Sequence, residues 1–167
     1  MKGLSKKRKI FLIIMLVLLT ATLGFIWINS MIPKAQSAEG SGAVFSALQA
    51  FLDAIFGEGV ISASTFRKLA HGAEFLLLGV ELNAIYMIAK RYSYKKVAEL
   101  LSLGLVVAVV DESIQILSDR GPLVTDVLID FGGIVTACAL FVIGYAIANA
   151  VRSRKAKKKI SEEIDKN

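Results

Sequence analysis

The charge-free run I-F-L-I-I-M-L-V-L-L-T-A-T-L-G-F-I-W-I, residues 10–28, decides the fold class of this chain. Its length is close to the ~20 apolar residues that an α-helix needs to cross the hydrocarbon core of a bilayer. The basic stretch K-K-R-K precedes it, so a cleaved signal peptide is the alternative. The run is longer than the ~7–15-residue apolar core of such peptides, and Gln36 occupies the small-residue position of the one cleavage-like stretch, A-Q-S-A. We therefore predict a retained membrane helix.

Three further apolar runs, at residues 69–89, 97–117 and 127–151, are long enough to span a membrane. The chain is 55% hydrophobic, with a mean hydropathy of +0.62, well above that of a typical soluble domain. Residues 43–56 place apolar side chains at helical spacing but are too short to span, which indicates an amphipathic helix at the membrane interface. The sequence predicts an all-α polytopic membrane bundle: a single domain, residues 1–151, with four transmembrane helices and this short interfacial helix. Residues 152–167 form a basic cytoplasmic tail.

The positions of the basic residues give an orientation. Of the 20 lysines and arginines, 16 lie at the N-terminus, in the 90–96 loop and in the C-terminal tail. Four spans place all three segments on one side of the membrane, whereas three spans would separate them. The positive-inside rule then puts both termini in the cytoplasm. Membrane lipids with anionic headgroups are the expected partners of these blocks, and the net charge of +6 is not a nucleic-acid signal.

An acidic and amide string, D-E-S-I-Q-I-L-S-D-R-G-P-L-V-T-D-V-L-I-D at residues 111–130, is the best functional pointer in the chain. Carboxylates inside membrane helices are expensive and usually serve a polar site in the bundle interior. The expected topology brings polar residues of three helices to one depth, in the extracytoplasmic half. The candidates for ligand binding or a proton relay are His71, Glu74, Asp111, Glu112, Gln115, Arg120, Asp126 and Asp130.

Helical spacing relates these candidates to one another. Asp111 shares a helix face with Gln115, and Asp126 shares one with Asp130, because each pair is four residues apart. Arg120 is the natural counter-charge, since its planar guanidinium group holds two carboxylates at once.

The pair His71 and Glu74 has three interpretations. It is a proton-transfer pair, a metal-ligand pair with Asp111 or Asp126, or a pair that orders the bundle near the headgroups. One histidine among carboxylates suits a hard cation better than zinc, but no recognised metal motif is present, so we predict no metal and no other cofactor. The sequence contains no nucleophile elbow or phosphate-cradling glycine loop, and no catalytic residue is assigned.

Other residues predict helix packing. The small residues of the last run favour close approach of a neighbouring helix; they are Gly132, Gly133, Ala137, Ala139 and Gly144. Glu81 and Asn83 are expected to form interhelical hydrogen bonds. The single cysteine, Cys138, excludes an intrachain disulfide and a cysteine-based zinc cluster, and is expected to pack in the interior.

Three ordered motifs resemble the VanZ-like membrane family. They are R-K-L-A-H-G-A-E-F-L-L-L-G at 67–79, D-E-S-I-Q at 111–115 followed by Arg120, and D-V-L-I-D-F-G-G at 126–133. The resemblance covers residues 67–144. Phe75 stands where the family commonly has Tyr, and Asp130 stands where Asn is usual.

The resemblance implies a small multi-helix protein of the bacterial cytoplasmic membrane. The founding member of the family is associated with low-level teicoplanin resistance. We therefore expect this chain to alter the interaction of the cell surface with glycopeptide antibiotics, or with the lipid-linked cell-wall precursors they bind, through an extracytoplasmic polar pocket. The alternatives are a membrane-embedded enzyme acting on a lipid-linked substrate, with Asp111 or Asp126 as base, and a small proton-coupled transporter.

Overall fold

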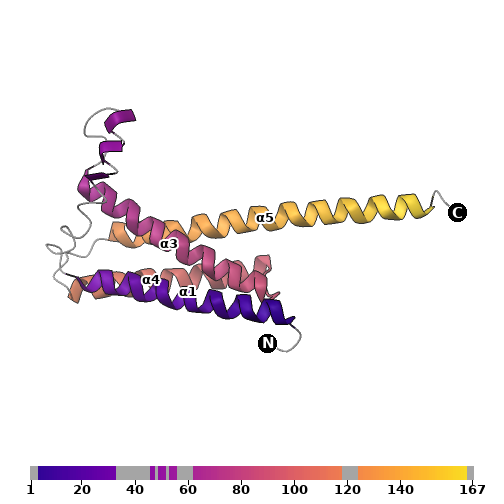
Figure 1. Cartoon of the computed structure of the whole chain (residues 1–167), viewed down its shortest axis with the longest axis horizontal. Coiled ribbons are helices and arrows are strands. Elements are labelled where there is room, and N and C mark those ends of the chain that lie inside the picture. Colours follow the sequence, from indigo (N-terminus) through magenta and orange to yellow (C-terminus); the bar gives the residue numbers. More distant parts are fainter. Residues whose placement is uncertain are drawn as a thin grey trace.

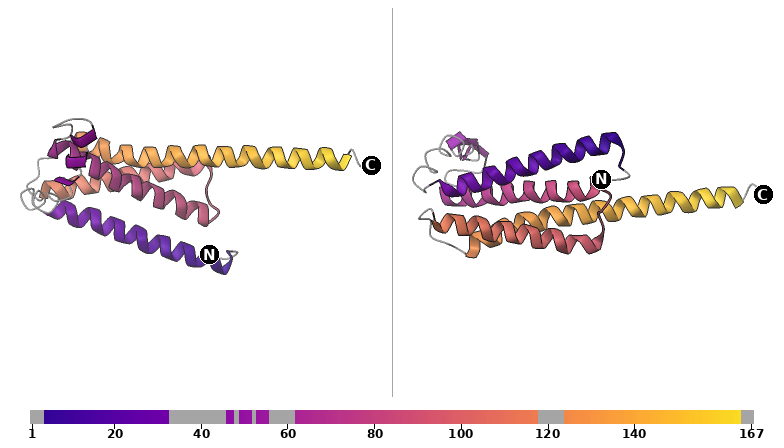
Figure 2. Two further views of the ribbon diagram at one scale, coloured as in Figure 1. Left: turned by 45° about the horizontal axis from the view of Figure 1, so that its top comes forward. Right: turned by 90° about the horizontal axis from the view of Figure 1, so that it is seen from below.

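The computed structural model describes residues 4–32, 46–47, 49–51, 53–55, 62–117 and 124–164. Its four long helices are α1 (Lys6–Met31), α3 (Ala63–Ile88), α4 (Tyr94–Leu117) and α5 (Val124–Ile164). They run lengthwise in one bundle, and α5 continues well beyond the other three (Figures 1 and 2). No strand occurs in the part of the chain that is described. The all-α prediction is confirmed.

Three of these helices are long and apolar enough to cross a membrane: α1, α4 and the Val124–Lys158 part of α5. The chain is therefore a helical membrane protein. The fourth predicted span, at residues 69–89, falls almost wholly within α3. That helix has the same 26-residue length as α1 but a less apolar composition, because it carries His71, Glu74, Glu81 and Asn83.

The predicted interfacial helix lies partly outside the described residues. Positions 46–47, 49–51 and 53–55 are helical, and the side chains of Phe51 and Ile55 are exposed. The amphipathic pattern accounts for a helix here, while its location at the membrane interface stays a prediction.

The interior is built from one stripe of each helix. Ile26 of α1 and Leu100 of α4 are fully buried, as is Ile134 of α5. The outward faces are also apolar; Val17 of α1, for example, is 63% exposed. This arrangement suits a lipid environment, where apolar side chains need no burial. Cys138 is buried in the interior, as predicted.

Small residues set the distance between α3 and α5. A Cβ atom added to Gly133 would lie 2.4 Å from the carbonyl oxygen of Gly72, closer than real side chains come. One turn further along α5, the Cβ of Ala137 would lie 2.6 Å from a Cβ added to Gly79 of α3. The prediction of close packing is confirmed for these two positions of α5. It is wrong for Gly132 and Gly144, where a Cβ would meet no atom within 4 Å, because they point away from α3.

The link between α3 and α4 closes one end of the bundle. α3 ends at Ile88, and Lys90, two residues later, adopts a left-handed conformation with φ 57°. Tyr92 then packs edge-on against Tyr145, with ring centroids 5.1 Å apart. The guanidinium of Arg8, at the start of α1, donates to the carbonyl of Ile88 at 3.3 Å. The beginning of α1 and the 89–93 link therefore lie at the same end.

Candidate functional site

A buried carboxylate lies at the opposite end of the bundle. Asp111 of α4 is fully buried. The hydroxyl of Ser30, from α1, donates to its Oδ1 at 2.6 Å, and the amide of Gln115 donates to its Oδ2 at 2.8 Å. The predicted i,i+4 pair of Asp111 and Gln115 is thus formed. Two hydrogen bonds fix the carboxylate and partly compensate the loss of water on burial.

Three candidates from three helices meet at this carboxylate. One nitrogen of His71 and one oxygen each of Asp111 and Asp130 all lie within 4.8 Å of one another. The side chain of Asp130 is 1% exposed, and its Oδ1 accepts no hydrogen bond from any residue in the described ranges. Two buried carboxylates at this separation repel one another unless a positive charge or a proton joins them.

Two further acids border this polar cluster, which we define as His71, Asp111 and Asp130. Glu74 Oε2 lies 3.9 Å from His71 Nδ1, so the two side chains are neighbours but are too far apart for a hydrogen bond, and the predicted proton-transfer pair stays a prediction. Glu112 is also buried, at 6% exposure. The acids of the D-E-S-I-Q motif are therefore both interior.

Asp126 is in a different environment, although it precedes Asp130 by one turn. Its Oδ1 lies 3.3 Å from the amine of Lys68, and both side chains remain about one-third exposed or more. Such a pair at the surface contributes little stability. Arg120, the predicted counter-charge, lies outside the described residues.

Sequence reasoning missed the contribution of α1. The hydroxyl of Ser30 donates to Asp111, and the hydroxyl of Thr22, about two turns earlier in the same helix, donates to Glu81 Oε1 at 2.9 Å. A signal was present, because Thr22, Ile26 and Ser30 follow one another at i,i+4 and so share a face. A hydroxyl repeated at helical spacing in an apolar span marks the face turned towards the bundle.

The second predicted interhelical bond is also present. Asn83 donates to the sulfur of Cys138, on α5, at 3.4 Å, and to the carbonyl of Gly79 in its own helix at 2.8 Å. With the Thr22–Glu81 bond, it confirms that Glu81 and Asn83 join α3 to its neighbours.

The sequence model that describes the VanZ/LLP1 family matches residues 10–146 of this chain. The chain belongs to the VanZ/LLP1 family. The match confirms the resemblance and includes all of the candidate residues. Neither the search of curated proteins nor that of solved structures returns a match.

In this VanZ/LLP1 protein the three motifs meet in space. His71 comes from the first motif, Asp111 from the second and Asp130 from the third, and the polar cluster contains one residue of each. The fold therefore explains why residues spread over three helices form one ordered pattern in the sequence.

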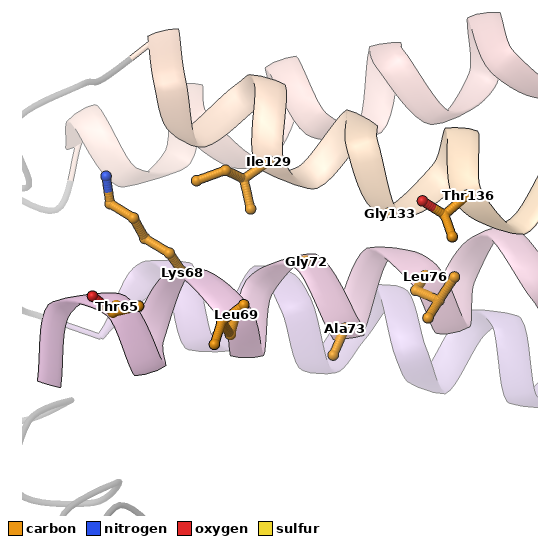
Figure 3. A pocket seen from close by; sticks show the side chains of 9 residues that line it. All are labelled: Thr65, Lys68, Leu69, Gly72, Ala73, Leu76, Ile129, Gly133 and Thr136. Atoms are coloured by element: carbon orange, nitrogen blue, oxygen red, sulfur yellow. The ribbon is translucent and has the colours of Figure 1, made fainter. Parts of the chain in front are cut away.

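An apolar groove runs beside the polar cluster, between α3 and α5 (Figure 3). Its volume is about 510 Å³. It is lined by Thr65, Lys68, Leu69, Gly72, Ala73, Leu76, Ile129, Gly133 and Thr136. None of the eight predicted site residues lines it. The amine of Lys68, paired with Asp126, gives it one charged end.

Proposed function

We propose that this VanZ/LLP1 protein alters how the cell surface interacts with glycopeptide antibiotics such as teicoplanin, or with the lipid-linked cell-wall precursors that they bind. The observation that carries the proposal is an apolar groove whose lining includes Gly72 and Ile129, the sequence neighbours of His71 and Asp130 in the polar cluster. A ligand with a hydrocarbon chain and a polar head matches that combination, because such ligands divide between apolar and polar surfaces.

The proposal includes a fourth span, formed by α3. Two polar side chains in its C-terminal half turn inwards, since Glu81 and Asn83 are 4% and 0% exposed, whereas its exposed residues include Leu69 and Leu77. A helix of 26 residues is long enough to cross the hydrocarbon core. Its lower hydropathy is compatible with spanning because the polar groups meet partners within the bundle.

The proposed membrane is a bacterial cytoplasmic membrane, with both termini in the cytoplasm. The N-terminal end of α1, the link between α3 and α4 and the far end of α5 all lie towards the same end of the bundle (Figure 1). The positive-inside rule assigns these basic ends to the cytoplasm and the polar cluster to the extracytoplasmic half.

Cysteine labelling tests this topology, because the native Cys138 is buried and can be replaced by alanine. In that background, Ser62→Cys should react with an impermeant maleimide in intact cells. Ser93→Cys and Ser161→Cys should react only after permeabilisation. Labelling of Ser62→Cys and Ser93→Cys from the same side would contradict a spanning α3.

The ligand proposal rests on the charged end of the groove. The hydrocarbon chain of a lipid-linked precursor fits the surface of Ala73 and Leu76, and its phosphate is complementary to the Lys68 amine. Because the ion pair between Lys68 and Asp126 is partly exposed and weak, a phosphate can compete for the amine.

Susceptibility to teicoplanin and vancomycin, with binding of labelled drug, tests the function in a sensitive Gram-positive host. At matched membrane levels, wild type should reduce teicoplanin capture, and His71→Ala and Asp111→Asn should not. Thr136→Phe should also abolish the effect by filling the groove. Val135→Phe is its control, since Val135 is exposed and does not line the groove. If wild type changes neither susceptibility nor drug binding, the proposal is wrong.

One observation bears on the enzyme alternative. Both oxygens of Asp111 accept hydrogen bonds and the residue is fully buried, whereas Asp126 is partly exposed and pairs with Lys68, which lines the groove. Of the two predicted bases, Asp126 is the one that a lipid-linked substrate reaches. An enzyme would leave altered lipids or wall precursors in expressing cells, whereas a transporter would show a flux that depends on the pH gradient.

A further inference from the structure

We propose that the polar cluster of His71, Asp111 and Asp130 binds one divalent metal cation of the Mn²⁺ type. This inference stands on the geometry of the three side chains and does not depend on the ligand proposed for the groove.

The distances fit one ion. The three ligand atoms lie within 4.8 Å of one another. Two ligands on opposite sides of a hexacoordinate ion are separated by roughly 4.2 Å, twice a bond of about 2.1 Å. Small side-chain rotations would therefore bring the three ligand atoms to coordination distance from one ion. Each ligand comes from a different helix, α3, α4 or α5, so the ion would tie three helices together.

The charges also favour a cation. The two carboxylates of the cluster carry a charge of −2, which a divalent ion neutralises, and the bordering acids Glu74 and Glu112 add to the attraction for a cation. Asp130 is 1% exposed, and no donor within the described ranges satisfies its Oδ1. Burial without compensation of that charge is expensive. The nearby amine of Lys68 is directed to Asp126, at 3.3 Å.

The surroundings of Asp111 resemble the outer shell of a metal site. Metal-binding carboxylates are commonly held in place by hydrogen bonds from residues that do not touch the ion. Ser30 and Gln115 supply such bonds, one to each oxygen of Asp111. Each oxygen keeps a second lone pair for a cation. The outer shell of the proposed metal site therefore includes Ser30 of α1, so all four helices contribute a residue to the site.

The ligand types decide the class of ion. Carboxylates suit hard divalent cations such as Mn²⁺ and Mg²⁺, whereas an imidazole favours transition metals. Mn²⁺ accepts both, and the remaining coordination positions would take water or an oxygen of a bound headgroup.

Titration of the metal-stripped, purified protein with Mn²⁺ tests the inference, with free Mn²⁺ measured by electron paramagnetic resonance. Wild type should bind one ion per chain. Asp130→Asn and His71→Gln should weaken binding by more than the ten- to hundredfold that loss of an outer-shell partner causes, and Ser30→Ala by about tenfold. Glu81→Gln, which changes a buried acid outside the cluster, is the control.

Two results would overturn the inference. One is equal Mn²⁺ binding by wild type, Asp130→Asn and His71→Gln. The other is no binding of Mn²⁺ by the wild-type protein, for which one ion per chain is expected. Mn²⁺ should raise the unfolding temperature of wild type but not of Asp130→Asn, a comparison that requires both to be folded. Because binding is measured on purified protein, it can fail or succeed independently of the drug experiment.

Discussion

The two ends of the bundle differ in where their charged groups lie: in the interior at one end and on the surface at the other. At one end Asp111, Asp130 and Glu112 are buried among the helices. At the other end the interior is aromatic, and the ion pair of Lys96 with Glu99 lies on the surface. The aromatic end has the arrangement that stability favours, because its charges stay hydrated. The polar end does not, which is the physical reason for assigning the function there.

The largest effect on stability is expected at the close contact between α3 and α5, the two helices that join both ends of the bundle. Gly133→Leu places a side chain where a Cβ alone would lie 2.4 Å from Gly72, so α3 and α5 must separate. Overpacking of this kind lowers the free energy of unfolding by about 3 kcal/mol or more. Reversible unfolding in mixed micelles measures it. The neighbouring Gly132→Ala, where a Cβ meets nothing within 4 Å, should be neutral or slightly stabilising.

The second effect is confined to the aromatic end. Tyr92→Ala removes a side chain that is 8% exposed and packs on Tyr145 and Phe141. Loss of a large buried ring lowers the free energy of unfolding by about 3 kcal/mol. Binding of Mn²⁺ and of labelled drug, measured below the unfolding transition, should remain at the wild-type level. A loss of either would show that the two ends are not separate.

The third prediction concerns the polar end, where two variants should change the free energy of unfolding in opposite directions. Ser30→Ala removes the donor to Asp111 Oδ1 and should lower the free energy of unfolding by about 1–3 kcal/mol. Asp130→Asn removes one of two neighbouring carboxylates and should raise the stability of the metal-free protein. The same unfolding assay, run with a chelator, measures both. Destabilisation by Asp130→Asn under these conditions would contradict the charge repulsion inferred here.

The smallest effect is expected at the exposed charges. Glu99→Gln breaks the surface ion pair with Lys96 and the hydrogen bond from Tyr86. Exposed pairs of this kind contribute little, so the unfolding temperature should stay within error of wild type.

The sequence was a good guide to the helices and to the cluster. Long apolar runs specify membrane helices almost by length alone, and each predicted span falls within or close to an observed helix. The proximity of His71 to Asp111 and Asp130 followed from helix direction, because alternate helices return to the same end. Helical spacing then put Gln115 on the face of Asp111.

The interhelical contacts were harder to predict. Ser30 could not be paired with Asp111 from sequence, because the partner depends on how α1 rotates against α4. Helical spacing grouped Asp126 with Asp130, but the first pairs with Lys68 at the groove and the second is buried. Small residues revealed that α5 packs closely, yet only the neighbouring helix decides that Gly133 is in contact and Gly132 is not.

The projecting part of α5 is long enough to turn a small change of helix tilt into a large displacement of its C-terminal end. Its tightest contact, at Gly133, lies near one end, and residue 158 follows 25 residues later. At a rise of 1.5 Å per residue, these positions are roughly 37 Å apart. If binding of an ion or a lipid beside Gly133 tilted the helix by about 10°, the basic tip would move by roughly 6 Å over that length. The exposed basic residues between Arg152 and Lys158 would then report, on one face of the membrane, an event taking place at the other.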